Sequence, residues 1–254
     1  MRGTRSGTEA QRLDYHKVES AQIKWAERSG TTILGMLIAE ELLLMCLDPE
    51  SGRTAVRRSR LSPALGGALL VDLVLMERIS LTPDETGRRQ RRRVQLISTV
   101  PTDDSELDFI IAHPQTWVDI KVSHLVRDAS GKRIVERLGD RLAAAGVLSE
   151  GPLTRFGTRT WPTGDPRPAQ AIRARVHAAM VGGPEPTERT LALVCLLDSL
   201  HRLPAVVRAI DPQVDPRIVR ERARQLSDGD WASQAVKDAI RETAAGLILA
   251  GGPL

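Results

Sequence analysis

Apolar positions recur with helical spacing along most of the chain. The clearest example begins near Leu37, where an acidic pair leads into a run of leucines, and it resumes after a turn at residues 48–52. In the second run, apolar side chains return every three or four residues at Leu65, Leu69, Leu73 and Met76. This spacing is typical of one face of a helix, and the small residues between these positions allow close packing. The pattern predicts a central, largely buried helix over residues 62–77.

The same periodicity predicts further helices over residues 104–113, 115–127, 132–145, 167–181, 187–200, 203–210, 215–226 and 231–249. The β-prone segment 94–100 predicts a short strand, and the threonines and aromatic residues around Gly157 predict a hairpin within 148–161. Residues 1–30 are polar and predict a partly disordered tail, with the folded domain over 31–250. We therefore expect an all-α protein: a single globular multi-helix domain with a central apolar helix core, peripheral amphipathic helices and a small β-hairpin.

Composition supports a helical core. Of the 254 residues, 41% are hydrophobic but only 3% are aromatic, so aliphatic side chains must build the interior. The net charge of +4 permits an anionic partner without requiring one. Only five of the 36 basic residues are lysine, so 31 are arginine, a bias that is typical of GC-rich coding and predicts a bacterial source.

Targeting signals and the positions of the cysteines indicate where in the cell the protein is expected. Residues 1–30 lack the apolar segment of a secretory signal, and no stretch approaches the roughly 18 apolar residues of a membrane span. Cys46 and Cys195 both lie in apolar runs and are expected to be buried thiols, without a disulfide framework. We expect a cytoplasmic protein that touches a membrane only from outside.

Motifs for catalysis are scarce. The chain has no glycine-rich phosphate loop, no His-Glu-x-x-His helix and no Gly-x-Ser-x-Gly elbow. Its five histidines are scattered without metal-ligand spacing, at positions 16, 113, 124, 177 and 201. The acidic residues at 103–108 lie at the predicted start of a helix, where negative charge is favourable. We therefore expect them to cap the helix rather than to act in acid–base catalysis. A binding protein without catalytic residues, metal or cofactor is therefore the expectation.

Several motifs occur in an order that resembles one family. The acidic pair, leucine run and glycine-centred helix of 37–81 come first, and Pro101–Asp108 follows. A helix ending in Gly-Val-Leu occupies 136–148, and a late apolar helix occupies 189–197. Together these segments resemble the Golgi phosphoprotein 3 family over roughly residues 35 to 250. The resemblance implies a non-enzymatic peripheral membrane adaptor that binds phosphatidylinositol 4-phosphate and an unidentified client protein.

The resemblance also implies where the lipid headgroup binds. The family holds the headgroup with one Trp and three Arg, and the matching positions here are Arg57, Gly66, Lys132 and Val135. Only Lys132 keeps the expected charge, so the inherited pocket is eroded. Neighbouring guanidinium groups can still bind phosphate oxygens. The candidate headgroup residues are therefore Arg57, Arg58, Lys132 and Arg133, with ordinary solvated arginines as the alternative.

Two further segments are candidate membrane contacts. Five arginines lie within 88–93, and we expect an anionic surface contact at Arg91, Arg92 and Arg93, unless this is simply a solvated loop. The family uses the hairpin for self-association or membrane contact, which here would involve Leu153, Phe156 and Trp161. The order of helix and basic hairpin also imitates a winged helix, in which Arg155 and Arg159 would meet DNA phosphates. A protein scaffold that has lost lipid binding is the remaining alternative.

Overall fold

The computed structural model describes residues 35–83, 92–112, 125–126, 129, 131, 133–155 and 157–228. The chain divides into two units, residues 1–36 and 37–254, and the fold below is that of the second unit. The predicted tail, the helix over 231–249 and most of the helix over 115–127 lie outside the described residues. The boundary near residue 30 therefore stays a prediction.

The described part of the second unit contains eight helices and confirms the all-α class. The helices are α2 (Ile38–Cys46), α3 (Arg58–Leu75), α4 (Ser105–Ile111), α6 (Ile134–Ala144), α7 (Pro166–Met180), α8 (Glu188–Ser199), α9 (Leu203–Arg208) and α10 (Pro216–Asp228). Except for α2, which was expected only as an apolar run, their bounds lie within a few residues of those expected from periodicity. The largest difference is at α3, which begins four residues before the predicted start at 62.

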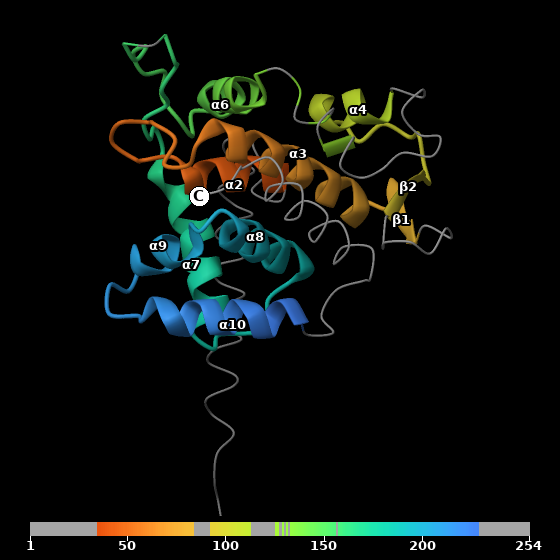
Figure 1. Cartoon of the computed structure of the whole chain (residues 1–254). Helices are drawn as coiled ribbons and strands as arrows, with labels where there is room; N and C mark the ends of the chain where they lie inside the picture. Colours follow the sequence, from red (N-terminus) through yellow and green to blue (C-terminus); the bar gives the residue numbers. More distant parts are fainter. Residues whose placement is uncertain are drawn as a thin grey trace, which may run out of the picture. The chain divides into compact units, whose positions relative to one another are not determined.

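Helices α2 and α3 form the centre of the core. Every residue of α2 is buried, and α3 buries its leucines at 61, 65, 69 and 73 completely. Helix α6 packs on α2 and α3, as does α8, and α10 packs on α8. Figure 1 shows α6 on one side of the α2–α3 pair and α7, α8 and α10 on the other. Burial of aliphatic side chains between these layers is the main stabilising contribution.

Polar side chains begin several helices. The Asp104 carboxylate accepts hydrogen bonds from the backbone N–H groups of Glu106 and Leu107, at 2.9 and 3.2 Å, at the start of α4. The Thr187 hydroxyl accepts from the Thr190 N–H at 3.3 Å at the start of α8. These bonds satisfy donors that a helix leaves unpaired in its first turn. The capping role expected for the acidic cluster is thus confirmed at Asp104.

A two-stranded antiparallel sheet follows α3. Strand β1 (Ile79–Pro83) pairs with β2 (Arg92–Leu96), and Ile79 lies opposite Leu96. The β-prone composition of 94–100 predicted a strand there, so the expectation is confirmed for β2 but with an earlier start and end. Nothing in the sequence pattern predicted β1.

The two cysteines differ in burial. Cys46 is fully buried in α2, and desolvation by burial raises the pKa of its thiol to about 12 in spite of the charge of Arg202. Cys195 of α8 is half-buried rather than buried. Cys46 is therefore an inert core residue, as expected.

Candidate functional site: an arginine-lined groove

The predicted headgroup residues lie at the starts of two adjacent helices. Arg57 is exposed and precedes α3, and Arg58 is the first residue of that helix. Arg133 is exposed and precedes α6, with a left-handed backbone conformation at φ 67°. The guanidinium of Arg58 donates to the Glu136 carboxylate, which connects the two helix starts. Lys132 lies outside the described residues.

Two positions that the resemblance assigned to headgroup-binding arginines lie inside the core. Gly66 is buried within α3, and Val135 of α6 is 1% exposed. Neither side chain can offer a charge to a ligand. Any cationic site in this chain must therefore use other residues.

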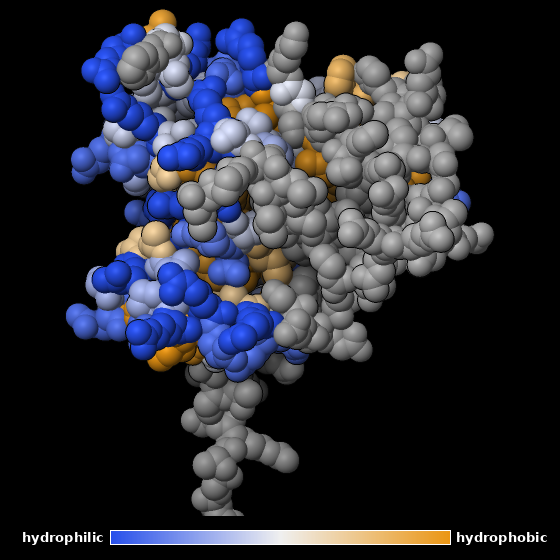
Figure 2. All heavy atoms as spheres, in the orientation of Figure 1, coloured by the Kyte–Doolittle hydropathy of each residue, from blue (hydrophilic) through white to orange (hydrophobic). Residues whose placement is uncertain are grey.

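A groove of about 440 Å³ lies beside the start of α3. Its described lining consists of four arginines and four threonines, contributed by the 47–57 loop, α3 and the 149–164 segment: Arg53, Thr54, Arg58, Thr154, Arg155, Thr158, Arg159 and Thr160. No carboxylate is among these residues. Figure 1 shows the loop and the 149–164 segment at the same end of α3, and hydrophilic residues dominate this segment in Figure 2. The lining combines positive charge with threonine side chains, of which Thr160 is buried and donates its hydroxyl to the Pro152 carbonyl at 2.8 Å.

The 47–57 loop is shaped by a tight turn. The Asp48 carboxylate accepts from the backbone N–H and hydroxyl of Ser51, at 2.8 and 2.6 Å. These hydrogen bonds lower the pKa of Asp48 below its usual range, the hydroxyl bond contributing most. Gly52 follows at φ 64°, and a Cβ there would lie 2.2 Å from the backbone of Trp161 and Pro162. Only glycine allows this close approach.

The loop and the 149–164 segment are joined through their backbones. The Trp161 N–H donates to the Gly52 carbonyl at 3.0 Å, and the Thr163 N–H donates to the Pro49 carbonyl at 3.0 Å. These bonds bring Arg53 and Arg159, which are far apart in the sequence, to the same groove. Local sequence patterns cannot predict a groove whose residues come from segments far apart in the sequence.

The predicted hairpin exists as an antiparallel turn rather than as two regular strands. Ser149 and Gly151 donate to the carbonyls of Pro162 and Thr160, at 2.8 and 3.0 Å. At the tip, the Thr154 N–H donates to the Thr158 carbonyl at 2.8 Å. Gly157 adopts φ 72° there. These bonds hold the threonines and arginines of the groove on a defined backbone.

The structure corrects the role expected for Trp161. This side chain is 1% exposed, so it does not supply apolar surface to a membrane or a second copy. Its indole N–H donates to the Asp140 carboxylate at 3.1 Å, and its ring lies so close to Gly139 that a Cβ there would approach to 2.5 Å. Trp161 therefore anchors the hairpin to α6. Leu153 is 64% exposed, and Phe156 lies outside the described residues.

Acidic side chains neutralise part of the groove. Glu136 pairs with Arg58, while Asp140 and Glu150 lie 3.4 and 3.7 Å from the Arg159 guanidinium. Burial opposes ionisation of Glu136, but the hydrogen bond and charge of Arg58 hold its pKa below the usual value. The Nη2 atom of Arg58 is buried without a hydrogen-bond partner among the described residues. A donor in this position is costly unless a ligand or water accepts from it.

A second cluster of charges lies inside the core. Glu41 of α2 contacts Arg175 of α7 at 2.6 Å and Arg189 of α8 at 3.4 Å. Arg189 also contacts Asp72 of α3 at 3.0 Å, and Asp72 accepts from the Ile38 N–H at 2.8 Å. Burial, aided by the charge of Glu41, raises the pKa of Asp72 to about 7 although Arg189 opposes the shift. These paired groups hold four helices together.

Sequence reasoning missed this core cluster. The acidic pair at 40 and 41 served only as a family marker, although charged residues within an apolar run are a signal of buried pairing. Glu40 accepts from the Leu37 N–H at 2.9 Å and from Arg141 of α6 at 2.7 Å. Both acids therefore have structural partners, and neither points to catalysis.

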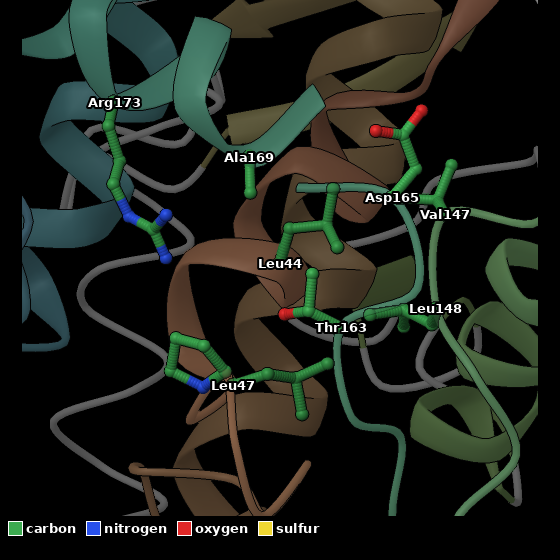
Figure 3. A pocket seen from close by; sticks show the side chains of 9 residues that line it. Leu44, Leu47, Val147, Leu148, Thr163, Asp165, Ala169 and Arg173 are labelled. Atoms are coloured by element: carbon green, nitrogen blue, oxygen red, sulfur yellow. The ribbon is translucent and has the colours of Figure 1, made fainter. Parts of the chain in front are cut away.

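A second cavity is too small for a ligand. It measures about 10 Å³, and Leu44, Leu47, Leu148 and Thr163 gather around it, as Figure 3 shows. Arg173 extends toward it from α7, and burial together with the charge of Arg202 lowers the pKa of Arg173. The space matches roughly one water molecule.

The arginine run over 88–93 is only partly described. Arg92 and Arg93 lie on β2, opposite Pro83 and Thr82, and Arg91 lies outside the described residues.

Among the described residues, no group of three or more acidic, histidine or cysteine side chains has the arrangement of a metal site. None of the helices that the structure describes is long and apolar enough to cross a membrane.

The helical core and the small sheet define an all-α protein with a basic groove at the start of α3. Residues 38–243 match the Golgi phosphoprotein 3 (GPP34) family, and the chain belongs to this family. It is also similar to the vacuolar protein sorting-associated protein 74 of Eremothecium gossypii. The two proteins are 25% identical over 232 residues, which cover 77% of this chain and 69% of the relative.

Proposed function

We propose that this protein is a non-enzymatic adaptor that associates peripherally with membranes by binding anionic lipid headgroups, such as a phosphatidylinositol phosphate. Family membership supports an adaptor role, and the name of the Eremothecium gossypii relative links that protein to protein sorting. On this proposal, a client protein binds elsewhere on the surface.

The observation that carries the proposal is the basic face at the starts of α3 and α6. Arg57 and Arg133 are both exposed there, and the Arg58–Glu136 pair keeps the two helix starts together. Lys132 adds a charge next to Arg133 in the sequence. Each basic residue close to an anionic membrane contributes about 1 kcal/mol of attraction. Several such residues on one face favour a membrane over a small soluble partner.

The hairpin and the arginine run extend this contact. Leu153 is exposed at the hairpin, where an apolar side chain can enter the interfacial region of a bilayer. Phe156 follows it in the sequence, and Arg91, Arg92 and Arg93 would add a diffuse attraction to any anionic surface.

Vesicle cosedimentation tests this function. We expect binding to vesicles containing phosphatidylserine or a phosphatidylinositol phosphate, little binding to neutral vesicles, and weaker binding as salt rises. Arg57→Ala with Arg133→Ala should weaken binding roughly thirtyfold, since about 2 kcal/mol of attraction is lost. The matched control, Arg217→Ala with Arg220→Ala on exposed positions of α10, removes the same charge elsewhere.

Two outcomes would overturn the proposal. Equal affinity for duplex DNA at the same salt concentration would favour the winged-helix alternative, in which Arg155 and Arg159 contact phosphates. No binding to either anionic vesicles or DNA would leave a protein scaffold without lipid binding.

A further inference from the structure

The hairpin of the 149–164 segment has a tightly packed base and an exposed tip. At the base, Thr160 is 4% exposed, and its hydroxyl donates to the Pro152 carbonyl at 2.8 Å. The two sides lie so close together that a Cβ at Gly151 would be 2.4 Å from the Thr160 hydroxyl oxygen. Toward the tip, Leu153 is 64% exposed. Since the base is held by its own contacts, the position of the tip depends on how the whole hairpin is oriented.

Trp161 connects this base to α6, which lies beside the hairpin in Figure 1. The indole N–H donates to the Asp140 carboxylate at 3.1 Å, and the Arg159 guanidinium lies 3.4 Å from the same carboxylate oxygen. A Cβ at Gly139 would lie 2.5 Å from the indole ring. The ring therefore occupies the space that a side chain at position 139 would need, and glycine is required there for this packing.

The ring adds an attachment that the backbone alone does not supply. Hydrogen bonds from the Trp161 and Thr163 N–H groups join one side of the hairpin to the 47–57 loop. Two hydrogen bonds along a single strand still allow rotation about that strand. The buried ring contacts a different element, α6, and so prevents this rotation. The orientation of the hairpin is thus determined by the loop and by α6 together.

Helix α6 also belongs to the basic face described above. Arg133 precedes the helix, and Glu136 pairs with Arg58 at the start of α3. A hairpin that is fixed to α6 keeps a set distance between its tip and this basic face. Two weak contacts on one rigid body bind a surface more tightly than two contacts joined by a hinge, because less conformational freedom is lost on binding.

We infer that Trp161 is a positioning residue for membrane binding. Its ring packs over Gly139 and bonds to Asp140, and this holds the hairpin so that Leu153 reaches the bilayer together with the basic face. Trp161 itself is 1% exposed and acts through Leu153, without touching lipid. The partner is a bilayer surface that accepts an apolar side chain and cationic groups at a fixed spacing. This inference rests on the proposed function.

Distance measurements between two spin labels test the positioning without a membrane. One label is attached through Leu153→Cys at the tip and the other through Ala144→Cys, an exposed position at the end of α6. Cys195, which is half-buried, is replaced by serine, while the buried Cys46 remains unlabelled because its thiol is inaccessible. Double electron–electron resonance then gives the distribution of tip-to-helix distances.

We expect a narrow distribution with wild-type packing and a broader or shifted one after Gly139→Ala, whose Cβ displaces the indole ring. Gly183→Ala is the matched control, since its Cβ would lie 2.8 Å from the Ala178 carbonyl, which belongs to α7. This control should keep the narrow distribution. An unchanged distribution for Gly139→Ala would overturn the inference.

Cosedimentation with phosphatidylserine vesicles tests the consequence for binding. Gly139→Ala leaves the net charge unchanged, and we expect it to weaken binding about fivefold, as Leu153→Ser should. The two substitutions together should weaken binding by no more than about the same fivefold, because both remove the contribution of the tip. Trp161→Phe keeps an aromatic ring over Gly139 and should bind within about twofold of the wild type, whereas Trp161→Ala should behave like Gly139→Ala.

The outcomes separate this inference from the proposed function. Equal vesicle binding by the wild type and Gly139→Ala would overturn the inference and leave the proposed function intact. Additive losses in the double variant would also overturn it, because Trp161 would then act other than through Leu153. A wild type that binds no anionic vesicles would overturn the proposed function and this role with it. Thermal unfolding followed by circular dichroism verifies that each variant is folded. If Trp161→Ala does not fold, Gly139→Ala and Trp161→Phe still decide.

Discussion

The core cluster and the groove use arginine in opposite ways. In the core, Arg175 and Arg189 contact Glu41 and Asp72, whose side chains are 0% and 1% exposed. In the groove, four arginines line a recess at the surface, and carboxylates pair with Arg58 and Arg159 there. A buried charged side chain needs an oppositely charged partner, because its removal from water costs free energy. A charged side chain at the surface keeps contact with water and does not need such a partner. The arginines of this chain therefore fall into two environments, one beside buried carboxylates and one at the surface.

Removal of a core arginine should have the largest effect. Arg189→Ala leaves Asp72 and Glu41 without one of their partners in a buried environment. We expect the free energy of unfolding to fall by about 3–5 kcal/mol, measured by denaturant titration. Arg53→Ala, at an exposed groove position, should change it by no more than about 0.5 kcal/mol. Similar losses for the two variants would break the contrast between core and groove.

The core cluster should also make stability depend on pH. The pKa of Asp72 is about 7 when folded, against an ordinary value of 3.8. Since the raised pKa favours the protonated form in the folded state, this contribution to stability is complete below pH 3.8 and is lost as pH rises toward 7. We expect the stability of the wild type relative to Asp72→Asn to fall across this window, by up to about 1.4 kcal/mol per pH unit.

Denaturant titrations of both proteins at several pH values measure that difference. An identical pH dependence for wild type and variant would contradict the raised pKa of Asp72. Arg53→Ala should keep the pH dependence of the wild type, because the groove is separate from the Asp72 pair.

Two glycines allow the support of the groove to be measured. Gly52→Ala places a Cβ 2.2 Å from backbone atoms of Trp161 and Pro162, at φ 64°. Gly146→Ala has a comparable φ of 74° with nothing within 4 Å, so it controls for backbone conformation alone. We expect Gly52→Ala to lower the free energy of unfolding by about 1–3 kcal/mol more than Gly146→Ala. Equal effects of the two substitutions would show that the loop can shift freely.

The smallest expected effect concerns the hairpin surface. Leu153→Ser removes an exposed apolar side chain beside the groove, and Ile218→Ser removes one of similar exposure, 62%, from α10. We expect Leu153→Ser to weaken vesicle binding roughly fivefold, since about 1 kcal/mol of apolar burial is lost. Ile218→Ser should leave vesicle binding unchanged. Equal losses in vesicle binding for both variants would indicate a membrane contact that does not involve the hairpin.

Hydrophobic periodicity alone determined most of the fold. The leucine spacing in 62–77 and the capping residues at 104 and 187 predicted helices whose positions the structure confirms. Helices are recognisable because their hydrogen bonds and side-chain faces repeat locally. The family could also be recognised from the sequence, because its motifs occur in order within these helices.

The tertiary structure alone decided which charges pair and which line the groove. Glu41 and Arg189 are 148 residues apart in the sequence. Arg53 and Arg155 line the same groove because backbone hydrogen bonds join the Gly52 loop to the hairpin. Trp161 was expected at the surface because an aromatic residue in a hairpin suits an interface, yet the space above Gly139 buries it. Pairing and burial depend on long-range packing, which local spacing does not encode. The sequence therefore determined the helices and the family, and the packing of those helices decided where the charges act.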